Sequence, residues 1–243
     1  MTKMKQNIEC VPFGGISNRL KCIISVIAEY ENVSLNWDSH TWQANCEFND
    51  LFKTVFPVTK ANPVNIKSCL FIHPYMNTQD GQNKNLLPLD LKEKYLKVIK
   101  SIVPVDYITD TVNTEYAKLG NYTTVTVRTF KGISWYSHFK IKNVFKFLDK
   151  IEGKILLTCD DDEIVNIIKD KYDVYTTPKR TSFGDSHSIE GMQDILIDQY
   201  LGSKAKHIYG TQLSTFPEIM WWLGLCKAKY TDMVLHEKPG FNC

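Results

Sequence analysis

The strongest constraint on the fold lies near the N-terminus, where four patterns follow one another within about thirty residues. Residues 7–13 have the apolar pattern of a short strand, and "GGISN" at 14–18 has the composition of a turn. Apolar residues at helical spacing fill 19–30, and alternating apolar residues mark a strand at 33–37. A strand, a crossover helix and a second strand form a βαβ unit with parallel strands. The chain is therefore expected to be an α/β protein.

A second series of alternating strand and helix patterns begins after Gly120. Two helix patterns, at 91–103 and 105–120, precede it, and Gly120 has the position of a glycine that ends a helix. The series runs from the strand "YTTVTVRTF" to the helix "STFPEIMWWLGLC" at 214–226. We therefore divide the chain into an N-terminal half, residues 1–119, and a C-terminal half, residues 120–243. The polar segment 77–90 lacks apolar periodicity and is the best candidate for a mobile loop.

Composition excludes several classes of protein. A net charge of +2 gives no reason to expect a nucleic-acid-binding surface. No segment approaches the roughly 18–20 apolar residues of a membrane span, and the N-terminus lacks the apolar core of a signal peptide. The seven cysteines are scattered without a C-x-x-C pair, which favours buried thiols over a zinc or redox site. We expect a cytoplasmic protein.

The glycine turn before the first helix is a possible anion site. Backbone N–H groups and the helix dipole can bind an anion where a strand and a glycine turn lead into a helix. Gly14 and Gly15 alone could simply form a tight turn, with Ser17 or Asn18 capping the helix. Asn18 and Arg19 add side-chain donors that suit phosphate or carboxylate. Both interpretations stay open on the pattern alone.

The C-terminal half offers a second possible anion site. Arg128 follows the strand that opens this half, and ligands of open α/β sheets bind beyond the carboxyl ends of strands. Ser214 and Thr215 stand at the N-terminus of the last helix, where hydroxyl and N–H groups suit phosphate. The alternatives are a solvated surface arginine and simple helix capping. Opposed anion sites in two α/β halves indicate a diphosphate ligand.

The acidic run "TCDDDE" has three possible roles. It could bind a metal ion, supply favourable acids to a helix N-terminus, or contact a base or ribose. We favour metal binding least. Asp160 is expected to cap the helix, and Asp161 to point outward as the ligand-contacting carboxylate.

Hydrolase and kinase motifs are missing from the sequence. It contains no G-x-S-x-G, no H-E-x-x-H and no Walker lysine. Two facing anion sites without an activated nucleophile suit a nucleotide-sugar transferase better than a hydrolase.

Four motifs in order resemble the fucosyltransferase-like glycosyltransferases. The family's opening is similar to "GGISNRL", followed by a strand that ends in Trp and then by "CEFNDLF". Its H-x-R strand is similar to "VTVRTF", and its strand–Asp-Asp–helix element to "LLTCDDDEIVNIIKDKY". Its closing signature is similar to "DILIDQYLGSKAKHIYGTQLSTF". The resemblance spans about residues 14–224. It implies a GT-B-like α/β fold with two Rossmann-like halves facing each other across a cleft, an acceptor-side half first and a donor-binding half second.

The resemblance also implies an activity and a set of site residues. The activity is metal-independent, inverting transfer of a 6-deoxyhexose from a nucleoside diphosphate sugar to a glycan or glycoprotein, without a cofactor. Arg128 would hold the β-phosphate, Ser214 and Thr215 the phosphates, and Asp160 or Asp161 the base. The donor-binding set is Gly14, Gly15, Asn18, Arg19, Arg128, Asp160, Asp161, Ser214 and Thr215.

Departures from the family pattern leave the donor open. The family histidine two residues before the arginine is Thr126 here, Thr129 follows Arg128, and "RTSFGDSHS" at 180–188 stands where a nucleotide-contacting loop is expected. L-Fucose from GDP-fucose is the first expectation, and L-rhamnose from a UDP, GDP or dTDP donor is the alternative. A non-catalytic nucleotide- or glycan-binding module on the same fold is the rival of an enzyme.

The general base is the least defined group. Asp38 is the first candidate, because it follows the strand at 33–37 whose carboxyl end faces the cleft in such folds. A loop carboxylate that merely starts a turn is the alternative for Asp38. Asp50, His73 and Asp185 are less favoured, and the reaction could also proceed without a base.

Overall fold

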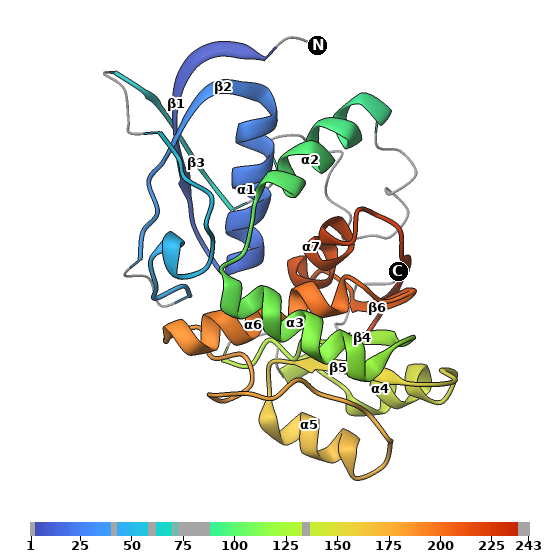
Figure 1. Ribbon diagram of the computed structural model, residues 1–243. Helices are drawn as coiled ribbons and strands as arrows, with labels where there is room; N and C mark the ends of the chain where they lie inside the picture. Colours follow the sequence, from blue (N-terminus) through green and yellow to red (C-terminus); the bar gives the residue numbers. More distant parts are fainter. Residues whose placement is uncertain are drawn as a thin grey trace.

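The computed structural model describes residues 3–39, 43–57, 62–69, 71, 88–132 and 137–237. Two parallel sheets with helices packed against them make up these residues (Figure 1). The predicted α/β class is confirmed. The predicted loop at 77–90 lies outside the described residues except for its last three. Most of "SCLFIHPY" at 68–75, whose apolar pattern predicts a further strand, also lies outside them.

The first sheet contains the predicted βαβ unit. Strand β1 (Met4–Pro12) leads through helix α1 (Ile16–Glu29) to β2 (Tyr30–Leu35), and β3 (Val64–Ser68) pairs with the other side of β1. All pairings are parallel. A single 3-10 turn, η1 (Phe48–Asp50), forms where the apolar spacing of 48–56 predicts a short amphipathic segment.

The second sheet has the strand order β5-β4-β6-β7, and its pairings are all parallel. Its strands are β4 (Thr123–Val127), β5 (Ile155–Cys159), β6 (His207–Thr211) and β7 (Lys229–Met233). Its helices are α4 (Ile141–Leu148), α5 (Asp162–Lys169), α6 (Ile189–Gly202) and α7 (Thr215–Leu223). The segment "DVYTTP" at 173–178 has the pattern of a short strand but forms only an isolated bridge between Tyr175 and Leu156. The pattern did not predict β7.

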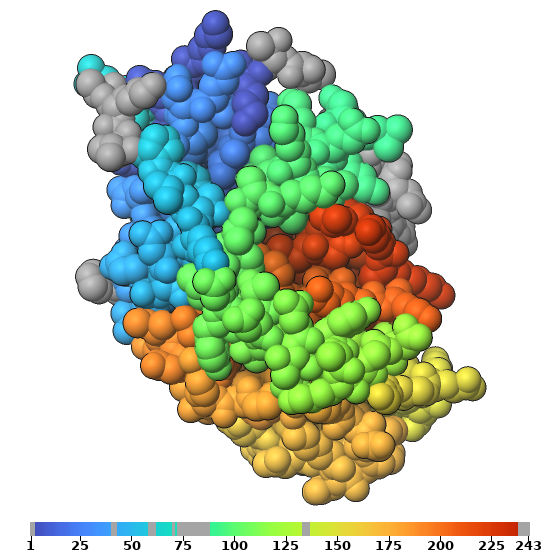
Figure 2. Space-filling view, viewed as in Figure 1, coloured from blue at the N-terminus to red at the C-terminus, as the bar shows by residue number. Residues whose placement is uncertain are grey.

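Two helices run across the join between the sheets. Helix α2 (Leu89–Ser101) packs against α1 and α7, whereas α3 (Asp106–Leu119) packs against α6. In Figure 2 the green surface of these two helices passes from the blue N-terminal part to the orange C-terminal part. Gly120 ends α3 with a positive φ of 69°, as predicted. The sheets thus separate between β3 and β4, and the exact division at residue 119 stays a prediction.

One apolar core extends beneath both halves. Leu20 and Ile23 of α1, Tyr95 of α2, Leu196 of α6 and Trp222 of α7 all belong to it. A smaller core lies between the second sheet and helices α4 and α5. Because α1 and α7 meet inside the larger core, the N-terminal ends of these two helices are held close to each other.

A buried ion pair lies inside this α1–α7 contact. Lys21 Nζ of α1 lies 2.9 Å from Glu218 Oε2 of α7, and the two side chains are 1% and 2% exposed. Two charges in such a position fix the relative placement of both helices, because either one alone would be very unfavourable there.

None of the described helices is both long and apolar enough to cross a membrane.

Candidate functional site

A cavity of about 540 Å³ lies between the two halves of the chain. The N-terminus of α1 lines it from the first half. Residues that follow β4 and β5 line it from the second half, together with Gly184, Ser186, His187 and the N-terminus of α7. Six of the predicted site residues line this cavity: Gly15, Asn18, Arg128, Asp160, Ser214 and Thr215.

The N-terminus of α1 is open toward the cavity. Gly15 is the N-cap residue, and no side chain caps the helix among the described residues. The expectation that Ser17 or Asn18 caps α1 is therefore wrong, because the helix begins at Ile16, before either of them. The first N–H groups of a helix have no partner within it and carry partial positive charge. Ile16, Ser17 and Asn18 line the cavity, so this end can bind an anion.

Gly14 shapes the turn that brings α1 to the cavity. Its φ is +81°, and a Cβ atom there would lie 3.0 Å from Asn18 Nδ2. A Gly14→Ala change should therefore lower the free energy of unfolding by about 1–2 kcal/mol, as measured by urea denaturation. Gly15→Ala is the matched control. A Cβ atom there meets no atom within 4 Å, and the loss of a favoured N-cap residue is offset by the reduced freedom of the unfolded chain, so a change under about 0.5 kcal/mol is expected. Equal effects at both positions would contradict this account of the turn.

The N-terminus of α7 faces the cavity from the opposite half. Ser214 caps the helix as predicted, accepting a hydrogen bond from Phe216 N at 3.4 Å, and both Ser214 and Thr215 line the cavity. Gln199 of α6 links the two helix ends, because its Nε2 donates to Ser17 Oγ at 2.9 Å and to the Phe216 carbonyl at 3.1 Å. Two helix N-termini thus converge on one cavity.

Arg128 adds a full positive charge between these helix ends. Its backbone N–H donates to Thr211 Oγ1 at 2.9 Å, and its Nη1 lies 3.1 Å from Asp160 Oδ2. The side chain is still 35% exposed and lines the cavity. The sequence has three arginines, and the other two, Arg19 and Arg180, do not line this cavity. Arg128 alone therefore offers the cavity a forked guanidinium donor.

The two aspartates after β5 have the opposite roles from those expected. Asp161 caps α5, because that helix begins one residue later than predicted; its Oδ1 accepts from Glu163 N at 3.1 Å and from Lys131 Nζ at 2.8 Å. Asp160 lines the cavity instead, and its carboxylate accepts the backbone N–H groups of Thr129 and Phe130 at 2.8 and 3.2 Å. Asp160 therefore orients Arg128 and the turn after β4.

Arg19 does not lie on the cavity wall. Its guanidinium is buried, donating from Nε to the Gly14 carbonyl and from Nη1 to the Asp38 carbonyl, both at 2.8 Å. It also lies 4.4 Å from the ring of Trp37. These contacts hold the glycine turn against the segment after β2. The geometry therefore gives no support to the predicted contact of Arg19 with the nucleotide-sugar donor.

Three of the four candidate general bases do not line the cavity. Asp38 is exposed but does not line the cavity. Asp50 accepts from Glu47 N at 2.8 Å in a local cap, and Asp185 accepts from Ser188 Oγ at 2.6 Å before α6. His73 lies outside the described residues.

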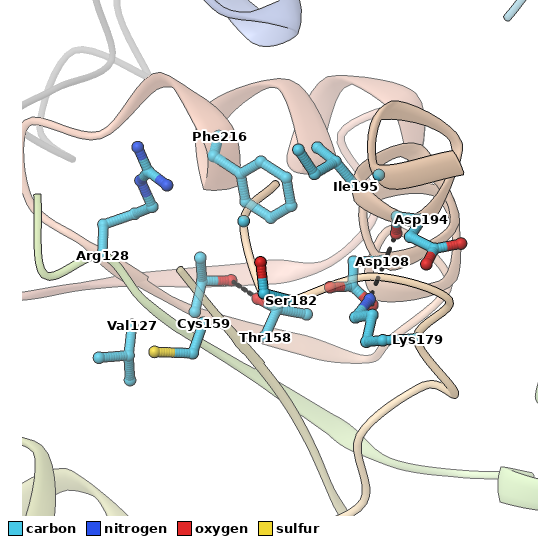
Figure 3. Close-up of a pocket in the computed structure, with 13 residues that line it drawn as sticks. Val127, Arg128, Thr158, Cys159, Lys179, Ser182, Asp194, Ile195, Asp198 and Phe216 are labelled. Atoms are coloured by element: carbon cyan, nitrogen blue, oxygen red, sulfur yellow. Dashed lines mark hydrogen bonds and ion pairs between the residues drawn. The ribbon is translucent and has the colours of Figure 1, made fainter. Parts of the chain in front are cut away.

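A side pocket of about 40 Å³ opens below Arg128 (Figure 3). It shares Arg128, Gly184, Ile195 and Phe216 with the main cavity. Figure 3 shows Arg128 at one end and a charged cluster at the other, where Lys179 Nζ lies 2.6 Å from Asp198 Oδ1. Burial raises the pKa of Asp198, and the neighbouring ammonium group opposes this effect.

Several residues on the wall were not singled out from the sequence. They come from loops, from α6 and from the first turn of α7. The sequence gives no signal for them beyond the polar character of 180–188: Gln43, Cys69, Phe130, Ser186, His187, Met192, Ile195, Leu213 and Phe216.

Comparison with known proteins finds similarity in structure and none in sequence families. No protein-family model and no curated protein matches the sequence. The fucosyltransferase NodZ from Bradyrhizobium matches with a TM-score of 0.55 at 14% identity, over 90% of this chain and 94% of NodZ. A variant of Arabidopsis thaliana FUT1 in complex with GDP matches with a TM-score of 0.56 at 12% identity, over 99% and 72% of the two chains.

POFUT1 in complex with GDP-fucose also matches, with a TM-score of 0.51 at 10% identity, over 96% of this chain and 99% of POFUT1. At these identities the likeness is one of fold. The chain has the GT-B fold of these fucosyltransferases, and the predicted fold class is confirmed.

Proposed function

We propose that the protein is a glycosyltransferase that moves a 6-deoxyhexose, L-fucose from GDP-fucose in the first instance, to a hydroxyl group of a glycan or glycoprotein. One observation carries the proposal: two helix N-termini and Arg128 converge on a single cavity of about 540 Å³ between the halves. NodZ, whose fold is similar, was co-crystallized with GDP and soaked with GDP-fucose. In this proposal residues 1–119 form the acceptor side, and residues 120–243 bind the donor.

The proposed reaction is an inverting transfer that needs no metal ion. The acceptor oxygen attacks the anomeric carbon from the face opposite the leaving diphosphate. Negative charge then grows on the β-phosphate, where fixed N–H dipoles and a guanidinium are worth several kcal/mol in a site shielded from water. Arg128, the N-terminus of α7 at Ser214 and Thr215, and the N-terminus of α1 at Gly15 and Asn18 are the groups that would stabilise this charge.

Other donors and a binding role remain alternatives. The base and the sugar rest on the family pattern, which this chain alters at Thr126 and Thr129, so L-rhamnose on a UDP, GDP or dTDP carrier is a second donor class. Thr126 is buried, its hydroxyl accepts from Thr158 Oγ1 at 3.1 Å, and it does not line the main cavity. We also propose a cytoplasmic location, since the six described cysteines are free thiols.

GDP binding gives the first test of the donor site. GDP at 100 times its Kd should add about 2.7 kcal/mol to the free energy of unfolding, which corresponds to a rise of roughly 5–10 °C in Tm for a chain of this size. Differential scanning fluorimetry with EDTA present measures this shift and tests the expectation that no metal is needed.

Matched ligands make the result specific. GMP lacks the β-phosphate and should give a much smaller shift, whereas UDP and dTDP test the identity of the base. A shift that requires Mg²⁺ would overturn metal independence. No shift with any nucleoside diphosphate would overturn the donor site, and GDP binding without release of GDP from GDP-fucose would favour the binding module.

A further inference from the structure

Five ionisable side chains lie on the described wall of the cavity: Cys69, Arg128, Lys131, Asp160 and His187. The proposed transfer must remove a proton from the acceptor hydroxyl, and a general base contributes typically 10²–10⁴-fold to such a step. Because Asp38 does not line the cavity, the base has to be sought among the groups that do.

Four of the five groups are poorly suited to accept that proton. Arg128 and Lys131 are cations, and Lys131 Nζ is bonded to Asp161 at 2.8 Å. Asp160 already accepts two backbone N–H groups and faces Arg128, so protonation would break contacts that shape the site. Cys69 would have to act as a thiolate, which would place negative charge beside the departing diphosphate.

His187 has both the chemistry and the placement. A neutral imidazole nitrogen accepts a proton near physiological pH. The His187 backbone is fixed from both sides: its N–H donates to Asp185 Oδ1 at 2.8 Å, and its carbonyl accepts from Asn45 Nδ2 at 3.0 Å. The backbone N–H of Asn45 also donates to the Ser186 carbonyl at 3.2 Å. Residues of both halves thus hold the loop, while the His187 side chain is exposed at the cavity.

We propose that His187 is the general base of the transfer, an inference that rests on the proposed function. The acceptor oxygen forms a bond to the anomeric carbon of the donor sugar. The bond between that carbon and the β-phosphate oxygen breaks, and its electron pair leaves with the nucleoside diphosphate. The proton of the acceptor hydroxyl passes to the imidazole of His187. Water serves as the simplest acceptor in the same step.

The test measures release of GDP from GDP-fucose with water as the acceptor. His187→Gln should lower kcat by about 10²-fold and leave the GDP-induced Tm shift unchanged, because the imidazole acts on the acceptor and not on the diphosphate. His187→Gly should be equally slow, and added imidazole should raise the rate of this variant at least tenfold. His138→Gln is the matched control, since His138 does not line the cavity and should keep the native rate.

Each outcome separates this inference from the proposed function. If the native protein binds GDP and releases it from GDP-fucose, but His187→Gln does so within threefold of the native rate, His187 is not the base. Loss of the GDP shift in His187→Gln, or no recovery of His187→Gly with imidazole, would assign His187 to donor binding or to structure instead. A native protein that neither binds GDP nor releases it contradicts the proposed function itself.

Discussion

Arg128→Ala is expected to lower kcat for GDP release from GDP-fucose by about 10²-fold or more. Arg128 is the guanidinium on the cavity wall, and its side chain is held 3.1 Å from Asp160, which two backbone N–H groups fix in turn. A cation fixed in advance stabilises charge that appears in the transition state without having to reorganise. Loss of one such donor costs about 2.7–4 kcal/mol in comparable sites. Steady-state kinetics at saturating GDP-fucose measures the effect.

Two lysine substitutions supply the control for charge. Arg128→Lys keeps the positive charge but loses the two-pronged donor, so it should recover only part of the rate. Arg180→Lys makes the same exchange at an arginine that does not line the main cavity and that bonds Asp194 at 2.8 Å. It should leave kcat within about twofold of the native value. Turnover of Arg128→Ala within fivefold of native would remove Arg128 from the proposed mechanism.

Lys21→Met is expected to lower the free energy of unfolding by about 3–5 kcal/mol, or roughly 10 °C in Tm. The change removes the ammonium group 2.9 Å from Glu218 and leaves a carboxylate that is 2% exposed. The desolvation cost of this carboxylate is then no longer offset by the ammonium charge of Lys21. Urea denaturation followed by tryptophan fluorescence measures the loss.

The double variant Lys21→Met with Glu218→Leu separates loss of charge pairing from loss of packing. It removes both charges and should recover much of the stability, because apolar groups of similar size often replace buried ion pairs at little cost. If the double variant is no more stable than Lys21→Met alone, the buried charge of Glu218 is not the cause. A loss below 1 kcal/mol in Lys21→Met would contradict this account of the ion pair.

Local patterns predicted much of the fold, because most elements have strong apolar periodicity. The βαβ unit at the N-terminus, α3 with Gly120 at its end, and β4 to β6 follow from spacing alone. Strand β7 was missed because its segment, "KYTDM", is polar and buries fully only Met233. The strand expected at 173–178 failed because Tyr175 pairs at a single point beside β5.

The sequence predicted those parts of the cavity wall that depend on strand ends and helix starts. Arg128, Ser214 and Thr215 lie at such positions, and the sequence marks them. A shift of one residue at the start of α5 exchanged the roles of Asp160 and Asp161. The burial of Arg19 against carbonyls, and the bond from Asn45 to the loop of His187, are contacts between distant segments that no local pattern reports.

The shared core under α1 and α7 has a mechanical consequence. A hinge motion that separates the two halves would expose Leu20, Ile23 and Trp222 to water. It would also move Lys21 away from Glu218. Each buried side chain of this kind costs about 1.5–3 kcal/mol to expose, so a wide hinge motion is strongly disfavoured in the folded chain. The two halves therefore keep their relative placement around the cavity. Its donor groups are set before any ligand enters, and a nucleotide bound there loses little affinity to rearrangement of the two halves.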